Sequence, residues 1–196
     1  MLLAVTIESA MPGGTTRIDG TRDEATDWAM AARTGDPVAT AAFIRSTQAE
    51  VWRFVASVVD SAAADDLTQE TYLRALRALP AFEGRASART WLFGIARRTC
   101  ADHIRATVRR RELLNRAATL DLGEPTGEDP SGSVGAAELL QRLSATQREA
   151  FVLTQVLGLS YEEAAQSLDV PIGTIRSRVA RARIELVAAV AQAMAV

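Results

Sequence analysis

The sequence predicts an all-α protein in which two small helical domains are joined by a flexible acidic linker. Apolar residues recur at helical spacing along most of the chain, and no stretch alternates apolar and polar residues as a half-buried strand does. The segment Asp121–Gly135, DLGEPTGEDPSGSVG, interrupts this periodicity with glycine, proline, serine and acid. Such a composition has too little apolar surface to form a core, so we expect it to separate the two domains.

Composition limits the classes of protein that fit. The chain has 196 residues, 48% of them hydrophobic, and a formal net charge of −2, which argues against a protein that coats nucleic acid or membranes indiscriminately. The single cysteine excludes an intrachain disulfide and suits a reducing cytoplasm, where we expect the protein to reside. We expect neither a membrane span nor a signal peptide, because no apolar run approaches ~18 residues and the start lacks a basic region.

The first domain is expected over residues 27–114, after a loose tail over residues 1–26. Asp36 and Pro37 have the residue types of a helix N-cap and first helical position. Valines at helical spacing follow, and the same spacing places Trp52 in the core. Further helices are expected over about 63–79 and 88–114, separated by a break that contains Pro80 and Gly84.

The second domain is expected over residues 137–190, after a linker over residues 115–136. Ser144–Gln147 and Ser160–Glu163 each have the pattern of a capping box, and Gly158 lies where the first of these two helices should end. Alanines on the apolar side of the helix after Ser160 allow another helix to approach closely. The turn at residues 169–171 then leads into a last helix, with proline near its first position.

The last helix has one apolar face and one face of threonine, serine and arginine. Ile175, Val179 and Ala182 recur at helical spacing, whereas Thr174, Arg178 and Arg181 occupy another side. A helix with these two faces, after a short turn, fits a helix-turn-helix whose second helix enters the DNA major groove. The alternative is a solvated arginine face on an ordinary terminal helix.

Charge is polarised along the first domain. Residues 60–70 hold four acids and no base, whereas residues 84–111 hold eight arginines and one acid, Asp102. An arginine-rich helix favours phosphate backbones, and Phe82 and Arg85 in the preceding loop could stack on or contact an unpaired base. The alternative is a charged helix that merely packs in a bundle. We expect Asp102 to tether neighbouring arginines and Trp91 to pack in the core.

No metal, cofactor or catalytic constellation is indicated. His103 is the only histidine and Cys100 the only cysteine, so a zinc site of usual ligand count cannot form. There is no glycine-rich phosphate loop and no pattern of paired carboxylates in a pocket-forming context. We therefore expect a protein that binds other macromolecules and is not an enzyme.

Three stretches resemble the signature motifs of bacterial extracytoplasmic-function (ECF) sigma factors, the smallest members of the σ70 family. They are ADDLTQETYLRAL, PAFEGRASARTWLFGIARRTCADHIRATVRRR and LSATQREAFVLTQVLGLSYEEAAQSLDVPIGTIRSRVARAR, in the order that the family has. The resemblance spans residues 27–188 apart from the linker. It implies a sigma region 2 domain followed by a region 4 helix-turn-helix domain.

The resemblance also implies a role for each surface. The acidic helix would bind the β′ coiled coil of RNA polymerase through Asp65, Asp66, Leu67, Gln69, Glu70 and Tyr72. The following loop and helix would bind the melted −10 promoter element through Phe82, Arg85, Ser87, Arg89, Thr90, Arg97, Arg98 and Arg105. The last helix would bind the −35 element as duplex through Pro171, Gly173, Thr174, Arg176, Ser177, Arg178 and Arg181.

The function implied is that of a sigma factor that binds core polymerase, through its β′ and β subunits, and directs promoter-specific initiation. An anti-sigma factor is a candidate further partner, because such proteins commonly hold ECF factors. One alternative is an independent helix-turn-helix regulator, which leaves the acidic helix, the basic helix and the linker unexplained. Another is a helical adaptor that binds only protein, for which the arginine face would be dispensable.

Overall fold

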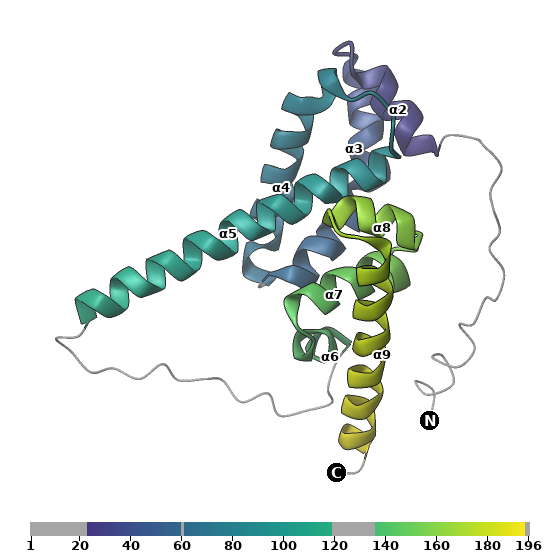
Figure 1. Cartoon of the computed structure of the whole chain (residues 1–196). Coiled ribbons are helices and arrows are strands. Elements are labelled where there is room, and N and C mark those ends of the chain that lie inside the picture. Colours follow the sequence, from purple (N-terminus) through teal and green to yellow (C-terminus); the bar gives the residue numbers. More distant parts are fainter. Residues whose placement is uncertain (1–22, 60, 119–135, 195–196) are drawn as a thin grey trace.

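The computed structural model describes residues 23–59, 61–118 and 136–194, and every regular element in these ranges is a helix. The first module comprises α2 (Glu24–Ala32), α3 (Pro37–Val58), α4 (Ser61–Ala78), the single 3₁₀ turn η1 (Leu79–Ala81) and α5 (Ala88–Ala118). The second comprises α6 (Ala136–Arg142), α7 (Ala145–Phe151), the π-helical η2 (Val152–Val156), α8 (Tyr161–Leu168) and α9 (Ile172–Met194). The all-α prediction is therefore confirmed over the described ranges (Figure 1).

Regular structure begins earlier than residue 27. The Asp23 carboxylate accepts from the backbone N–H of Thr26 at 2.7 Å and caps α2, whose Ala25 and Ala29 are buried. The Thr26 hydroxyl in turn accepts from the backbone N–H of Ala88, at the start of α5. This helix has too few large apolar residues to show a clear period in the sequence. Residues 1–22 of the expected tail lie outside the described residues.

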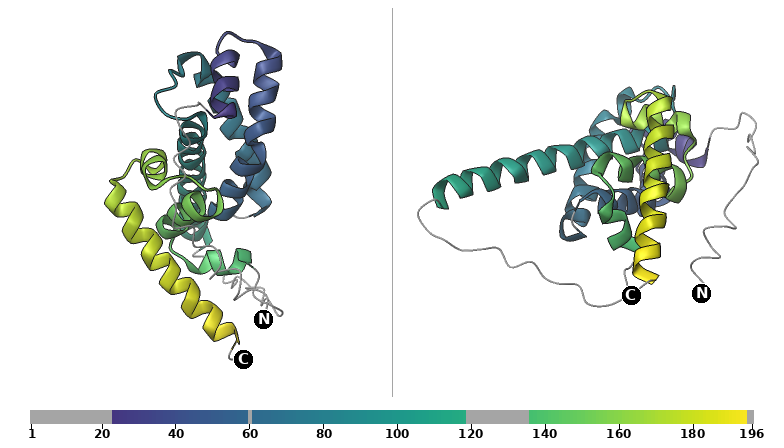
Figure 2. Two further views of the ribbon diagram at one scale, coloured as in Figure 1. Left: turned by 90° about the vertical axis from the view of Figure 1, so that its right-hand side faces the viewer. Right: turned by 60° about the horizontal axis from the view of Figure 1, so that its bottom comes forward.

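Helix α5 is the longest of the described helices, and helices of both modules pack against it. Its first half packs against α3 and α4 on one side and α8 on another, while its second half extends away from the other helices (Figures 1 and 2). Ile104, Val108 and Leu113 are accordingly exposed. The helix continues to Ala118, four residues beyond the end expected from the sequence, and residues 119–135 of the expected linker lie outside the described residues.

Two aromatic residues do not lie where the sequence placed them. Trp52 is 43% exposed, so the prediction of a core position is wrong. Phe82, expected to stack on an unpaired base, is only 5% exposed and packs against Trp91 with ring centroids 4.9 Å apart. The ring of Phe82 therefore contributes to the hydrophobic core and is not accessible to a base in this structure.

Helix caps position the second module as the sequence indicates. Ser144 and Ser160 both form complete capping boxes, with Gln147 and Glu163 respectively. Gly158 has a φ of +73° and ends the helical run. Asp169 adopts the left-handed conformation after α8, and the N–H of Thr174 donates to the carbonyl of Pro171 as α9 begins. Helices α8 and α9 and the turn between them form the expected helix-turn-helix.

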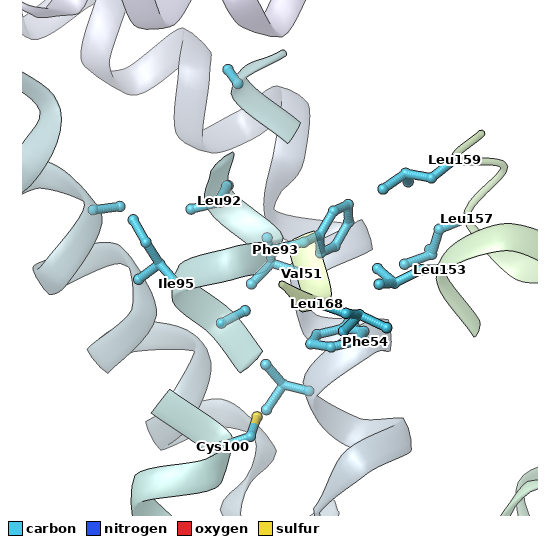
Figure 3. Packing of buried hydrophobic residues seen from close by; sticks show 14 of the residues in the cluster. Val51, Phe54, Leu92, Phe93, Ile95, Cys100, Leu153, Leu157, Leu159 and Leu168 are labelled. Carbon is cyan, nitrogen blue, oxygen red and sulfur yellow. The ribbon is translucent and has the colours of Figure 1, made fainter. Parts of the chain in front are cut away.

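A single hydrophobic core runs through both modules. Phe54 of α3 and Phe93 of α5 belong to the same cluster of buried residues as Leu153 and Leu168 of the second module (Figure 3). Helix α8 packs on α5, and α6, α7 and η2 pack on α3. The two modules are thus joined by buried apolar contacts as well as by the chain between them.

Candidate nucleic-acid interface

The acidic helix α4 presents part of its predicted binding set to solvent. Asp65, Asp66 and Gln69 are exposed, whereas Leu67 is 9% exposed and packs in the core, which contradicts its expected accessibility. The Tyr72 hydroxyl is hydrogen-bonded to Thr47 at 2.7 Å, and burial raises the pKa of this phenol to about 12. The partly buried Glu70 accepts from Arg74 Nε at 2.7 Å.

An open, mainly apolar groove of about 380 Å³ lies between α3 and α4. It is lined by Ile44, Gln48, Thr68, Gln69, Tyr72, Leu73 and Leu76. Leu73 is 51% exposed, and the buried Thr68 hydroxyl has no hydrogen-bond partner. Helix α4 thus carries exposed acids and also forms one wall of an accessible apolar groove. The acids and the groove together suit a protein partner with both basic and apolar side chains.

Trp52 contributes to this acidic surface. Its indole Nε1 donates to Asp65 Oδ1 at 2.7 Å, across from α3 to α4. This bond could not be predicted, because the spacing of the valines indicated a core position for Trp52. The bond fixes the direction of one exposed carboxylate of the predicted polymerase-binding set.

The start of the basic helix α5 is engaged with both modules. Thr90 is 3% exposed, and its hydroxyl is hydrogen-bonded to Ser87 at 2.8 Å. Arg89 Nε donates to Glu50 at 2.8 Å in a half-buried ion pair, and its Nη2 donates to the carbonyl of Leu157 at 2.8 Å. These residues of the predicted −10 set therefore face protein in this arrangement.

Farther along α5 the arginines become progressively more exposed. Arg97 Nε lies 3.5 Å from Glu149 of α7, whereas Arg98 and Arg105 are exposed. Asp102 accepts from Arg105 at 2.6 Å and from Arg74 at 2.7 Å, and these bonds, that of Arg74 first, lower the pKa of the Asp102 carboxyl. The expected tethering role of Asp102 is confirmed.

In the loop before α5, Arg85 is an exposed member of the predicted −10 set. Its side chain is 86% exposed and pairs with Glu83 at 2.5 Å. An exposed ion pair of this kind contributes little to stability, so Arg85 can exchange partners readily.

The predicted −35 set comprises Pro171, just before α9, and residues on the accessible side of the first turns of α9. Pro171, Gly173, Arg176, Ser177 and Arg181 are exposed, and Thr174 and Arg178 are half-buried. The opposite face is anchored, because Ile175, Val179 and Ala182 are buried. The N-terminal half of α9 therefore has the amphipathic form that a recognition helix needs.

Two charged residues between the modules were not singled out in the sequence. Arg148 of α7 is 9% exposed and donates to the carbonyls of Ser57 at 3.0 Å and Leu143 at 3.1 Å. Burial lowers the pKa of Arg148 and raises that of Glu149. Both lie in the third signature stretch, but their partners Ser57 and Arg97 belong to the other module, so only the packing of the modules reveals these contacts.

The described ranges contain no cluster of three or more histidine, cysteine or acidic residues that could hold a metal ion. Nor is any helix among the described residues long and apolar enough to cross a membrane. Cys100 is buried, and burial raises the pKa of its thiol to about 12.

Two family models and several curated proteins match the chain. The chain matches the family models for Sigma-70 region 2 over residues 43–110 and Sigma-70, region 4 over residues 135–186. It is 51% identical over 170 residues to the ECF RNA polymerase sigma factor SigC of Mycobacterium tuberculosis, covering 85% of this chain and 91% of that relative. It is 33% identical over 162 residues to the ECF RNA polymerase sigma-E factor of Escherichia coli K12, covering 76% and 85%.

Solved structures show the same fold. CnrH, in complex with the cytosolic domain of CnrY, superposes with a TM-score of 0.65 at 26% identity, over 86% of this chain and 99% of that chain. The sigma factor RpoE from Bartonella quintana, in complex with the anti-sigma factor NepR, superposes with a TM-score of 0.56 at 31% identity, over 73% and 91%.

An all-helical module with one acidic and one basic helix, followed by a helix-turn-helix, defines a DNA-binding protein of the transcription apparatus. The relatives identify the family to which this protein belongs. The chain belongs to the σ70 family of RNA polymerase sigma factors, and within that family to the ECF group.

Proposed function

We propose that this protein is a promoter-specificity subunit of bacterial RNA polymerase, which acts in the cytoplasm and catalyses no reaction itself. The observation that carries the proposal is the division of charge between helices of one chain. Exposed acids lie on α4, arginines lie along α5, and a second arginine face lies on α9. A protein that must bind both polymerase and two separate promoter elements needs these three surfaces.

The surfaces are assigned to partners by their chemistry. Asp65, Asp66 and Gln69, beside the apolar groove between α3 and α4, would bind the β′ coiled coil of core polymerase. The basic face of α5 would bind the melted −10 strand, because an arginine-rich helix suits a phosphate backbone. The exposed face of α9 would bind the −35 duplex, where arginine can pair with guanine edges or phosphates.

Two relatives suggest how the protein is controlled. The solved structures of RpoE and CnrH contain a second protein, named as an anti-sigma factor in the case of RpoE. A similar partner of this chain would bind surfaces that polymerase or promoter DNA otherwise uses. The β subunit of polymerase is a further expected contact of the second module.

The test is to mix the purified protein with bacterial core RNA polymerase and map transcription from a genomic promoter library. The expected result is a set of discrete start sites, each preceded by a shared two-part motif, and these sites would also reveal the promoter sequence. Folded protein that gives no core binding and no initiation, but binds palindromic DNA unaided, would overturn the proposal in favour of an independent helix-turn-helix regulator.

A further inference from the structure

The contact between the two modules covers the part of α5 that we assign to the −10 element. Helix α8 packs across α5, and the hydroxyl of Ser167 donates to the carbonyl of Thr90 at 3.1 Å. The helices approach closely at Gly94, where a Cβ atom would lie 3.6 Å from the carbonyl oxygen of Ser167. The −10 strand cannot reach the Thr90 face of α5 while α8 remains in place.

One arginine of the first module binds the end of a helix in the second. Arg89 Nη2 donates to the carbonyl of Leu157, the residue that follows η2. Carbonyls at the end of a helix lack partners within that helix and carry the negative end of its dipole, so a cation is favoured there. The Nε atom of the same guanidinium is held by Glu50, which fixes the direction of the fork.

One arginine of the second module makes the converse contact. Arg148 Nη1 donates to the carbonyl of Ser57, in the last turn of α3, at 3.0 Å. Its Nη2 donates to the carbonyl of Leu143, just after α6. Each module thus supplies one guanidinium that binds the carboxyl end of a helix in the other.

We propose that Arg89 and Arg148 form a reciprocal latch that holds the modules closed in the polymerase-free protein, and that promoter DNA competes with Leu157 for Arg89. The competition rests on the proposed function, whereas closure by the latch does not. Arg148 is a positioning residue that touches no assigned DNA or polymerase surface. Arg89 has two alternative partners, a backbone carbonyl when the modules are closed and the promoter strand when they are open.

The chemistry of the latch makes it reversible. Arg148 is nearly buried and its Nε atom has no hydrogen-bond partner, so part of the gain from its hydrogen bonds is offset by desolvation of the charge. The two modules also share few charged pairs; Arg97 and Glu149 lie 3.5 Å apart, which is long for a hydrogen-bonded ion pair. A partner that offers phosphates to the arginines can therefore displace these contacts.

The test measures how often the contact between the modules opens in the full chain. A Ser167→Cys variant places a thiol at a position that is 4% exposed and faces α5. Its rate of modification by a maleimide, resolved from that of Cys100 by peptide mass spectrometry, reports the open fraction even when that fraction is small. In this background, Arg148→Gln and Arg89→Lys should each raise the rate by about tenfold, the factor that one hydrogen bond from a charged donor contributes.

Matched controls separate the latch from general destabilisation. Arg142→Gln removes an exposed arginine at the end of α6 and should leave the rate unchanged. Gly94→Ala fits the space beside Ser167, whereas Gly94→Leu should force α8 away and raise the rate strongly. If Arg148→Gln lowers the free energy of unfolding in urea, the modification rate of the Arg89→Lys variant tests the latch instead. Among the described residues, Arg89 donates to the second module through the carbonyl of Leu157, so this variant mainly affects the contact between the modules.

The possible outcomes differ clearly. Unchanged rates for both arginine variants, with a raised rate for Gly94→Leu, would overturn the latch. A rate for the Ser167→Cys protein itself equal to that of a free thiol, or no effect of Gly94→Leu, would overturn the closed state itself. A single-stranded −10 oligonucleotide should raise the rate further; if it does not while the arginine variants do, the latch stands and the proposed DNA role of Arg89 fails.

Discussion

The hydroxyl of Ser167 donates to the backbone carbonyl of Thr90 at 3.1 Å, which ties the helix-turn-helix to the helix assigned to the −10 element. The single hydrogen of this hydroxyl is shared with a second acceptor, the carbonyl of Glu163, one turn earlier in α8, at 2.9 Å. The two assigned promoter surfaces differ in accessibility. The face of α9 around Arg181 is exposed, whereas Thr90 of α5 is buried. Free protein should therefore bind −35 duplex more readily than −10 strand.

Replacing Ser167 with alanine should increase the affinity of the free protein for a single-stranded −10 oligonucleotide by about fivefold. The variant loses one hydrogen bond between the modules, worth about 1 kcal/mol, and alanine preserves helix α8. Fluorescence anisotropy with a labelled oligonucleotide measures the change. Ser46→Ala, which removes a hydroxyl bonded only within α3, is the control. Equal affinity of both variants would show that this bond does not restrict access to α5.

Replacing Trp52 with phenylalanine should weaken binding to core polymerase by roughly two- to tenfold, which corresponds to the ~1 kcal/mol of one hydrogen bond. The variant loses the indole N–H that fixes Asp65, while the half-exposed position accepts another aromatic ring. Binding to labelled core polymerase measures the loss, and Asp66→Arg on the same helix is a positive control. The urea midpoint should remain close to that of the wild type. Unaltered polymerase binding by the Trp52 variant would show that the direction of Asp65 is immaterial.

Much of the fold could be predicted because helix boundaries are encoded locally. Asp36 caps α3, and Ser144 and Ser160 form their capping boxes with residues three positions farther along the chain. Trp52 was placed wrongly for a related reason. Its neighbour Val51 is 1% exposed, and helical spacing alone does not show where the buried face of α3 ends.

The contact between the modules could not be predicted, because three of its hydrogen bonds end on backbone carbonyls. The acceptors for Arg89, Arg148 and Ser167 are carbonyl oxygens of the other module, and every residue has such an oxygen. Glu50 pairs with a residue 39 positions away, and no motif fixes that distance. The charged faces of α4 and α9, in contrast, are encoded as runs of like residues, so these surfaces can be predicted from the sequence without their arrangement.

Replacing Arg178 and Arg181 together with alanine should abolish −35 recognition while leaving core binding intact. Each lost base contact should cost about 1–3 kcal/mol in affinity for the cognate duplex. The anchored face of α9 is untouched, since Ile175 and Val179 remain buried. Transcription from a cognate promoter, compared with co-purification of core polymerase, separates the two effects. Retained promoter activity would show that the arginine face is dispensable and would overturn its assignment to the −35 element.

The pH dependence of stability should depend on Glu149, whose side chain is 12% exposed and lies 3.5 Å from Arg97. Burial raises the pKa of Glu149 despite the opposing effects of Arg97, Arg178 and Arg148, and the buried Cys100 thiol also lies within its electrostatic reach. The folded chain therefore binds a proton at a pH where the unfolded chain has already released it. This contribution to stability is fully present below the ordinary pKa of glutamate and is lost as pH rises through the raised value.

Glu149→Gln, which mimics the protonated side chain, should therefore be more stable than the wild type at pH 7. Its advantage should shrink as pH falls toward the ordinary pKa of glutamate. Urea unfolding at several pH values measures the free energy of unfolding, and Glu112→Gln, at an exposed position near the end of α5, is the control. Asp102 has a lowered pKa and makes both proteins less stable in acid, so the difference between them isolates Glu149. Lower stability of Glu149→Gln at pH 7 would instead mean that the attraction to Arg97 outweighs the cost of burial.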